Sequence, residues 1–307
     1  MNNGLKITAY AAALAVTFGV AYGVGNGIDP LVAAEARPAP EHGGHGTQQE
    51  DAAGAAGPAG GLGVSDGGYT LELQTPEVGA GARTGIRFAV VEDATGRKVT
   101  DYQREHGKEL HFILASRDLG TYRHLHPVRA SDGTWSVPVD LPAAGDYRAF
   151  ADFTPAAEGA RKLVLGADLA VSGDYRPKAF PAARATAVTD GYRVDLGGGL
   201  KAGRESDLKL TVSRNGRPVT DLQPYLGAYG HLVALRSGDL AYLHVHPAEG
   251  GPGPAVSFAA TAPSGGTYRL FLDFRHGGKV HTAAFTVEAG KPDTGRTQSP
   301  DSGEHKH

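Results

Sequence analysis

An internal repeat constrains the fold of this chain more than any other feature of its sequence. The matched segments are Gly68-Tyr69 with Gly191-Tyr192, Lys98–Pro127 with Pro218–Pro247, and Gly145–Phe153 with Gly266–Phe274. The central pair aligns without a gap, and both of its members end in His-x-His-Pro. A period of roughly 120 residues is too long for a solenoid unit and is typical of a whole domain. The sequence therefore predicts a duplicated domain.

The repeat also sets the expected domain boundaries. We expect a signal peptide or membrane anchor at 1–24, a disordered linker at 25–65, a first domain at 66–172, a linker at 173–187, a second domain at 188–289 and a disordered tail at 290–307. Both the first linker and the tail are poor in large apolar residues, so neither can bury a core of its own.

Each repeat unit reads as all-β. In the first unit, about seven short apolar or alternating segments recur between Gly, Pro, Asp and Ser breaks, which favours an immunoglobulin-like arrangement. A Gly-x-Tyr that enters an apolar strand, at Tyr147 and again at Tyr268, resembles the tyrosine corner of such domains. We therefore predict two tandem immunoglobulin-like β-sandwich domains that follow an N-terminal hydrophobic helix.

The N-terminal apolar run indicates where the protein resides. Ile7–Val24 carries no charge, is preceded by Lys6 and is followed by Asp29 and Glu35. This charge asymmetry places the rest of the chain outside the cytoplasm. The run is intermediate between a signal-peptide core and a membrane span. We expect an extracytoplasmic protein that is anchored in the cell membrane, or secreted if the segment is cleaved.

Composition limits the chemistry that is available. The net charge is −3 and there is no basic stripe, so we expect no nucleic-acid partner. The chain has no cysteine, and its one methionine is Met1. A metal site must therefore use histidine or carboxylate ligands, which favours copper(II) or zinc(II) over copper(I). Thirteen histidines are present to supply such ligands.

Three of these histidines are predicted to converge in the first unit. If Arg117–Gly120 is the loop of a hairpin, His111 lies directly opposite His126, and His124 shares their face because it is two residues from His126. Opposed residues on one sheet face are close enough for their imidazoles to share an ion. The pattern therefore predicts a three-histidine metal site.

The second unit repeats this pattern with the same spacing. There His231 is expected to oppose His246, and His244 joins them, across a loop at Ser237–Leu240. The sequence thus predicts one three-histidine site in each domain.

An aspartate follows the corner tyrosine in each unit. Asp152 and Asp273 lie on the strand expected to neighbour that of His111 or His231, respectively. Each could serve as a carboxylate ligand or as an acceptor that fixes an imidazole tautomer.

The two stretches HGKELHFILASRDLGTYRHLHP and YLGAYGHLVALRSGDLAYLHVHP carry a family resemblance. They resemble bacterial exported or membrane-anchored "heavy-metal-binding" secreted proteins with tandem His-x-His-Pro β-sandwich modules. The resemblance implies metal binding in the cell envelope, with copper as the metal.

Two functions of different classes remain open. The first is an extracytoplasmic protein that binds Cu(II) or Zn(II), one ion per domain, for metal buffering or delivery. The alternative is a non-catalytic envelope stalk, adhesion or protein-interaction module that binds no metal, with an unknown envelope protein as partner. No nucleophile motif, general base or phosphate-binding loop is evident, so we do not expect an enzyme.

Overall fold

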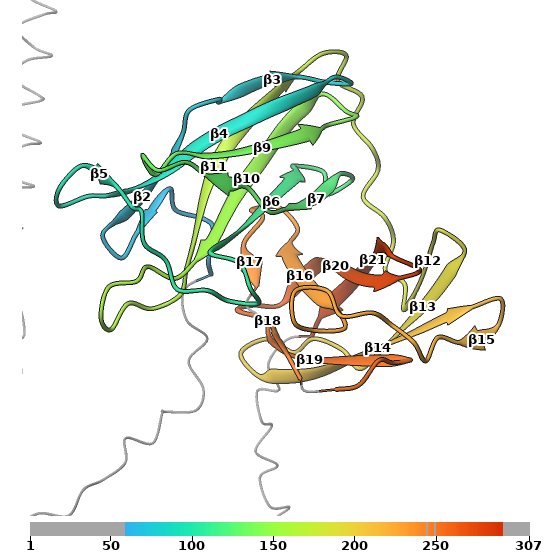
Figure 1. Ribbon diagram of the computed structural model, residues 1–307. Helices are drawn as coiled ribbons and strands as arrows, with labels where there is room; N and C mark the ends of the chain where they lie inside the picture. Colours follow the sequence, from blue (N-terminus) through green and yellow to red (C-terminus); the bar gives the residue numbers. More distant parts are fainter. Residues whose placement is uncertain (1–58, 244, 249, 291–307) are drawn as a thin grey trace, which may run out of the picture. The chain divides into compact units, whose positions relative to one another are not determined.

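The computed structural model describes residues 59–243, 245–248 and 250–290. The predicted N-terminal apolar segment, most of the first linker, the C-terminal tail and His244 lie outside these residues. In the described part of the chain, none of the secondary structure is a helix with the length and apolar character needed to span a bilayer. Every element described there is a β-strand (Figure 1).

The first sandwich has two sheets. In chain order its strands are β1 (Ser65–Asp66), β2 (Tyr69–Leu73), β3 (Glu77–Gly79), β4 (Arg83–Glu92), β5 (Arg97–Lys98), β6 (Leu110–Ser116), β7 (Tyr122–Leu125), β8 (Val128–Arg129), β9 (Trp135–Asp140), β10 (Gly145–Phe153) and β11 (Leu163–Ser172). One sheet has the order β1-β2-β4-β9-β8, with β5 paired to β4, and the other has the order β3-β11-β10-β6-β7. The core lies between them and includes Phe88, Phe112 and Trp135.

The second sandwich follows the same plan. Its strands are β12 (Thr186–Thr189), β13 (Tyr192–Gly197), β14 (Glu205–Arg214), β15 (Arg217–Pro218), β16 (His231–Arg236), β17 (Tyr242–Leu243), β18 (Val245–Pro247), β19 (Ala255–Thr261), β20 (Gly266–His276) and β21 (Lys279–Ala289). One sheet runs β12-β13-β14-β19-β18, with β15 paired to β14, and the other runs β17-β16-β20-β21.

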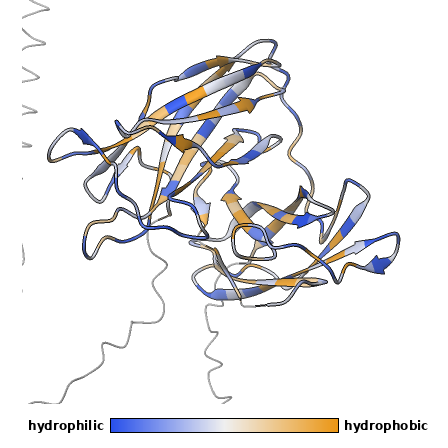
Figure 2. Ribbon diagram, viewed as in Figure 1, coloured by the Kyte–Doolittle hydropathy of each residue, from blue (hydrophilic) through white to orange (hydrophobic). Residues whose placement is uncertain are grey.

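The alternation of side chains explains why these segments form half-buried strands. Along β9, buried and exposed residues alternate strictly, because successive side chains of a strand point to opposite faces. Figure 2 shows apolar and polar residues interleaved along many strands. β6 differs, since all of its residues are buried, so both faces of its sheet must be covered.

The tyrosine corner predicted in each unit is confirmed. The hydroxyl of Tyr147 donates to the carbonyl of Ala143 at 2.8 Å, and that of Tyr268 donates to the carbonyl of Ser264 at 2.9 Å. Together with the sheet order, these bonds establish two immunoglobulin-like sandwiches.

A third apolar cluster covers the outer face of β6 and joins the two sandwiches, which belong to one compact unit. Its buried members are Ile113, Ala115, Leu119, Tyr122 and Phe150 from the first sandwich and Val233, Leu235, Leu240, Tyr242 and Phe271 from the second. The rings of Tyr122 and Phe271 stack with centroids 4.1 Å apart. His111, His124 and His231 lie on β6, β7 and β16, which contribute to this cluster, so their surroundings are set by this interface.

Candidate metal centre

The hairpin of the first sandwich has the predicted register. Phe112 pairs with Leu125, and Ile113 pairs with His124. His111 and His126 lie one residue beyond these pairs, so both project to the face that carries His124. One ring nitrogen from each of the three histidines lies within 4.8 Å of the others. The three imidazoles therefore converge as the sequence indicated.

Their spacing fits a single ion. His111 Nδ1 lies 3.0 Å from His124 Nε2. Two nitrogens bound at about 2.0–2.1 Å are about 2.9 Å apart at a right angle and about 3.3 Å apart in a tetrahedron. The ring centroids are 5.3, 5.4 and 4.9 Å apart, and about 5 Å is expected for imidazoles around a tetrahedral ion.

Burial keeps two of these rings neutral and ready to bind. Burial lowers the pKa of His111 to about 2 and that of His126 to about 3, and the neighbouring histidines lower both further. Among the described atoms, His111 Nε2 and His126 Nε2 are buried without a hydrogen-bond partner. Buried polar atoms rarely lack a partner, and an ion is one way to satisfy His126 Nε2. In His111 the nitrogen that faces His124 is Nδ1, so an ion bound there leaves the proton on Nε2.

A carboxylate from the second sandwich orients the cluster of the first. His124 Nδ1 donates to Asp273 Oδ2 at 2.9 Å, which leaves Nε2 free to face His111. Thr282 and Tyr122 donate to the same carboxylate at 2.5 and 3.4 Å. Asp273 pairs with His231 in the sheet, as predicted, but its carboxylate contacts His124 instead. The expectation that Asp273 belongs to the His231 cluster is therefore corrected.

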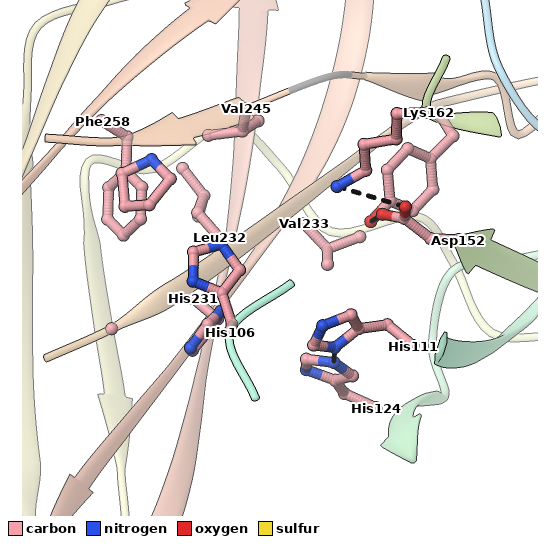
Figure 3. A pocket seen from close by; sticks show the side chains of 13 residues that line it. His106, His111, His124, Asp152, Lys162, His231, Leu232, Val233, Val245 and Phe258 are labelled. Carbon is pink, nitrogen blue, oxygen red and sulfur yellow. Dashed lines mark hydrogen bonds and ion pairs between the residues drawn. The ribbon is translucent and has the colours of Figure 1, made fainter. Parts of the chain in front are cut away.

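Asp152 has a different environment, although it also lies on the predicted neighbouring strand and pairs with His111. Its Oδ1 lies 3.2 Å from the ammonium of Lys162 (Figure 3), and the hydroxyl of Tyr242 donates to its Oδ2 at 3.3 Å. Burial raises the pKa of this carboxyl, and Lys162 opposes that effect. Asp152 is thus paired with a cation of the chain and does not join the three histidines.

The second hairpin has its predicted register next to the loop, but His246 does not continue it. Among the described residues, β16 pairs with β17 through Ala234–Leu243 and Leu235–Tyr242. The chain then switches sheets, and His246 pairs with Ala259 of β19. His246 is therefore not opposed to His231, because the strand that carries it has left the hairpin. The side chain of His246 and all of His244 lie outside the described residues.

Sequence reasoning missed that both sandwiches contribute to one cavity. This cavity, of about 60 Å³, is bordered by His111 and His124 of the first sandwich and His231 of the second, with His106 and Lys162 also in its lining. Figure 3 shows these side chains around the opening. The sequence signal related to this arrangement is that the repeat matches Tyr122 with Tyr242, and the structure buries both in the apolar cluster between the sandwiches.

Comparisons with known proteins identify a family and a general fold. A family model described as "Domain of unknown function (DUF8832)" matches residues 63–164 and 186–291. No curated protein matches the chain. These findings give no support to the expected heavy-metal-binding family.

Two similar solved structures are bacterial adhesins. FdeC of Escherichia coli is 16% identical over 74% of this chain and 65% of its own, with a TM-score of 0.23. InvE of Yersinia pseudotuberculosis is 11% identical over 72% and 58%, with a TM-score of 0.24. The chain spans less than two thirds of either structure, and scores this low carry no argument about function.

Proposed function

Since the chain belongs to the DUF8832 family, whose description states no function, we propose from the site alone that it binds one divalent metal ion. The ligands are His111, His124 and His126, and the ion is zinc(II) or copper(II), because neutral imidazoles suit these borderline ions. The role is metal buffering or delivery, without catalysis. Its location outside the cytoplasm rests on the apolar run Ile7–Val24.

The hydrogen bond from His124 to Asp273 carries the proposal. Metal-binding histidines characteristically donate their second ring N–H to a carboxylate or a carbonyl, which fixes the tautomer and raises the basicity of the ligating nitrogen. Here Asp273 is only 2% exposed and accepts this proton at 2.9 Å. The arrangement leaves His124 Nε2 facing the two other rings.

Metal titration of the full chain tests the proposal. We expect one tightly bound zinc(II) or copper(II) ion per chain by calorimetry, and loss of that binding in a His111→Gln, His126→Gln double variant. Circular dichroism verifies that the variant is folded. An unchanged stoichiometry and affinity in the folded double variant would sink the idea.

The alternative is an interaction module that needs no metal. Its support is the architecture, because tandem sandwiches serve as binding modules in many unrelated proteins and a fold does not specify a function. Binding of the chelator-treated chain to isolated cell-envelope fractions, unchanged on addition of zinc(II), would favour this function. Binding that requires zinc(II) would favour the metal-dependent one.

A further inference from the structure

Three histidines leave a fourth position on a tetrahedral ion. Structural zinc sites are usually closed by four protein ligands, whereas an open position is filled by water or another molecule. The cavity beside His111 and His124 is also lined by His106 and His231 (Figure 3). Either histidine is therefore a candidate to close the coordination sphere.

The ring of His231 is already oriented like that of a ligand. Its Nε2–H donates to the carbonyl oxygen of Tyr225 at 2.8 Å. The other nitrogen, Nδ1, then carries the lone pair. A backbone carbonyl that accepts the second ring proton is the same outer-shell arrangement that Asp273 provides for His124. Two histidines, one from each sandwich, are thus held in metal-binding tautomers.

His231 lies close enough to the three histidines of the first sandwich for a small movement to bring it to the ion. Its ring centroid lies 6.3 Å from that of His111 and 6.2 Å from that of His124. These values exceed the spacing of about 5 Å around a tetrahedral ion by about 1 Å. Because His231 pairs with Asp273, which itself bonds His124, the strand that carries it is anchored at the cluster.

His106 is the weaker candidate. Its ring is as far from that of His111 as the ring of His231 is, 6.3 Å, but its side chain is exposed, on a turn where the backbone has φ 52°. The equivalent position of the second unit is Leu226, with a similar φ of 55°. The turn therefore tolerates leucine, which makes His106→Leu a well-matched control.

We infer that His231 supplies the fourth ligand, so that one ion is bound by both sandwiches and links them. The inference rests on the proposed metal binding and adds its coordination and its consequence. Metal occupancy then stabilises the contact between the sandwiches, because the ion binds the docked arrangement in preference to a separated one.

Ring-nitrogen NMR of the unmutated chain tests this without risk to the fold. On zinc(II) addition we expect the 15N resonance of His231 Nδ1 to move to a metal-bound position while Nε2 stays protonated. An unchanged His231 Nδ1 resonance, with the three first-sandwich histidines shifted, overturns the inference and leaves the proposed function standing. No shift at any histidine overturns both.

Variants provide the second measurement. His231→Gln is expected to lower zinc(II) affinity by at least about tenfold and to change the visible spectrum of the cobalt(II)-loaded chain, because a ligand is lost. His106→Leu is expected to leave both unchanged. Equal affinity and an equal cobalt(II) spectrum in His231→Gln and the unmutated chain contradict the inference.

Discussion

The two halves of the interface come from one duplicated sequence, yet they present different chemistry. In each half a tyrosine of one sandwich donates to a buried aspartate of the other, Tyr122 to Asp273 and Tyr242 to Asp152. Asp273 also accepts from His124, whereas Asp152 faces the ammonium of Lys162. The chain already supplies a cation beside one carboxylate, and beside the other it supplies an imidazole.

The residue opposite each aspartate reinforces the difference. Thr282 lies opposite Asp273 on β21 and donates to it at 2.5 Å. Val164 lies opposite Asp152 on β11, and its side chain has no hydrogen-bond donor. Duplication therefore preserved the tyrosine–aspartate contacts of the interface. The side chains around the two aspartates differ, and only the half that contains Asp273 suits an external cation.

The largest expected effect separates the two His-x-His-Pro motifs. His124→Gln removes a ligand and the partner of Asp273. Loss of an outer-shell partner alone costs roughly 10–100-fold in metal affinity, so we expect the zinc(II) affinity of this variant to fall by more than about 100-fold. The matched His244→Gln variant is expected to bind normally. Calorimetry measures both, and equal losses would show that the two motifs are equivalent.

A smaller effect separates the two aspartates. Asp273→Asn weakens the orientation of His124, and we expect a loss of about 10–100-fold in zinc(II) affinity. Asp152→Asn leaves the affinity unchanged and reduces stability instead, because Lys162 loses the buried one of its two carboxylate partners and keeps only Glu105, at 2.7 Å. Competition with a chelator of known affinity, together with thermal unfolding, distinguishes these outcomes. A larger affinity loss in Asp152→Asn would reverse our assignment.

Acid sensitivity of the metal-free chain is the smallest effect. Burial lowers the pKa of His231 to about 4, above the values of about 2 and 3 for His111 and His126. The unfolded chain binds these protons near pH 6.5 and the folded chain does not, so stability is full above that pH and is lost as pH falls below it.

The expected slope is at most about 1.4 kcal/mol per pH unit for each histidine. Urea unfolding between roughly pH 7 and pH 5, with chelator present, measures it. His111→Gln and His231→Gln should each reduce the slope by the contribution of one histidine. The reason is that the pKa of each ring in the folded chain lies below the pH range of the measurement. A slope unchanged in both variants would mean that these rings are protonated in the folded chain.

Much of the fold followed from the sequence because the signals are local. The alternation along β9, the corner residues Tyr147 and Tyr268, and the register of β6 with β7 all depend on neighbouring side chains and one short loop. The convergence of His111, His124 and His126 was predictable for the same reason. A hairpin register fixes which residues share a face.

The strand pairing of His246 in the second unit could not be predicted from the local sequence pattern. Its motif has the same spacing, and the described pairs of β16 with β17 have the predicted register, but His246 pairs with Ala259 in the other sheet. This residue therefore belongs to the sheet of β19 and not to that of β16. The sequence pattern does not predict the change of sheet, because His-x-His-Pro is identical in both units.

By itself, the sequence determined the duplication, the strands, the tyrosine corners and the three-histidine cluster of the first hairpin. The tertiary structure alone decided that Asp273 orients His124 across the interface and that His231 borders the same cavity. It also decided that Lys162 pairs with Asp152 within the first sandwich. The physical reason for the first two is that these contacts join different sandwiches. They depend on how two complete domains dock, and no periodicity within either domain encodes that docking.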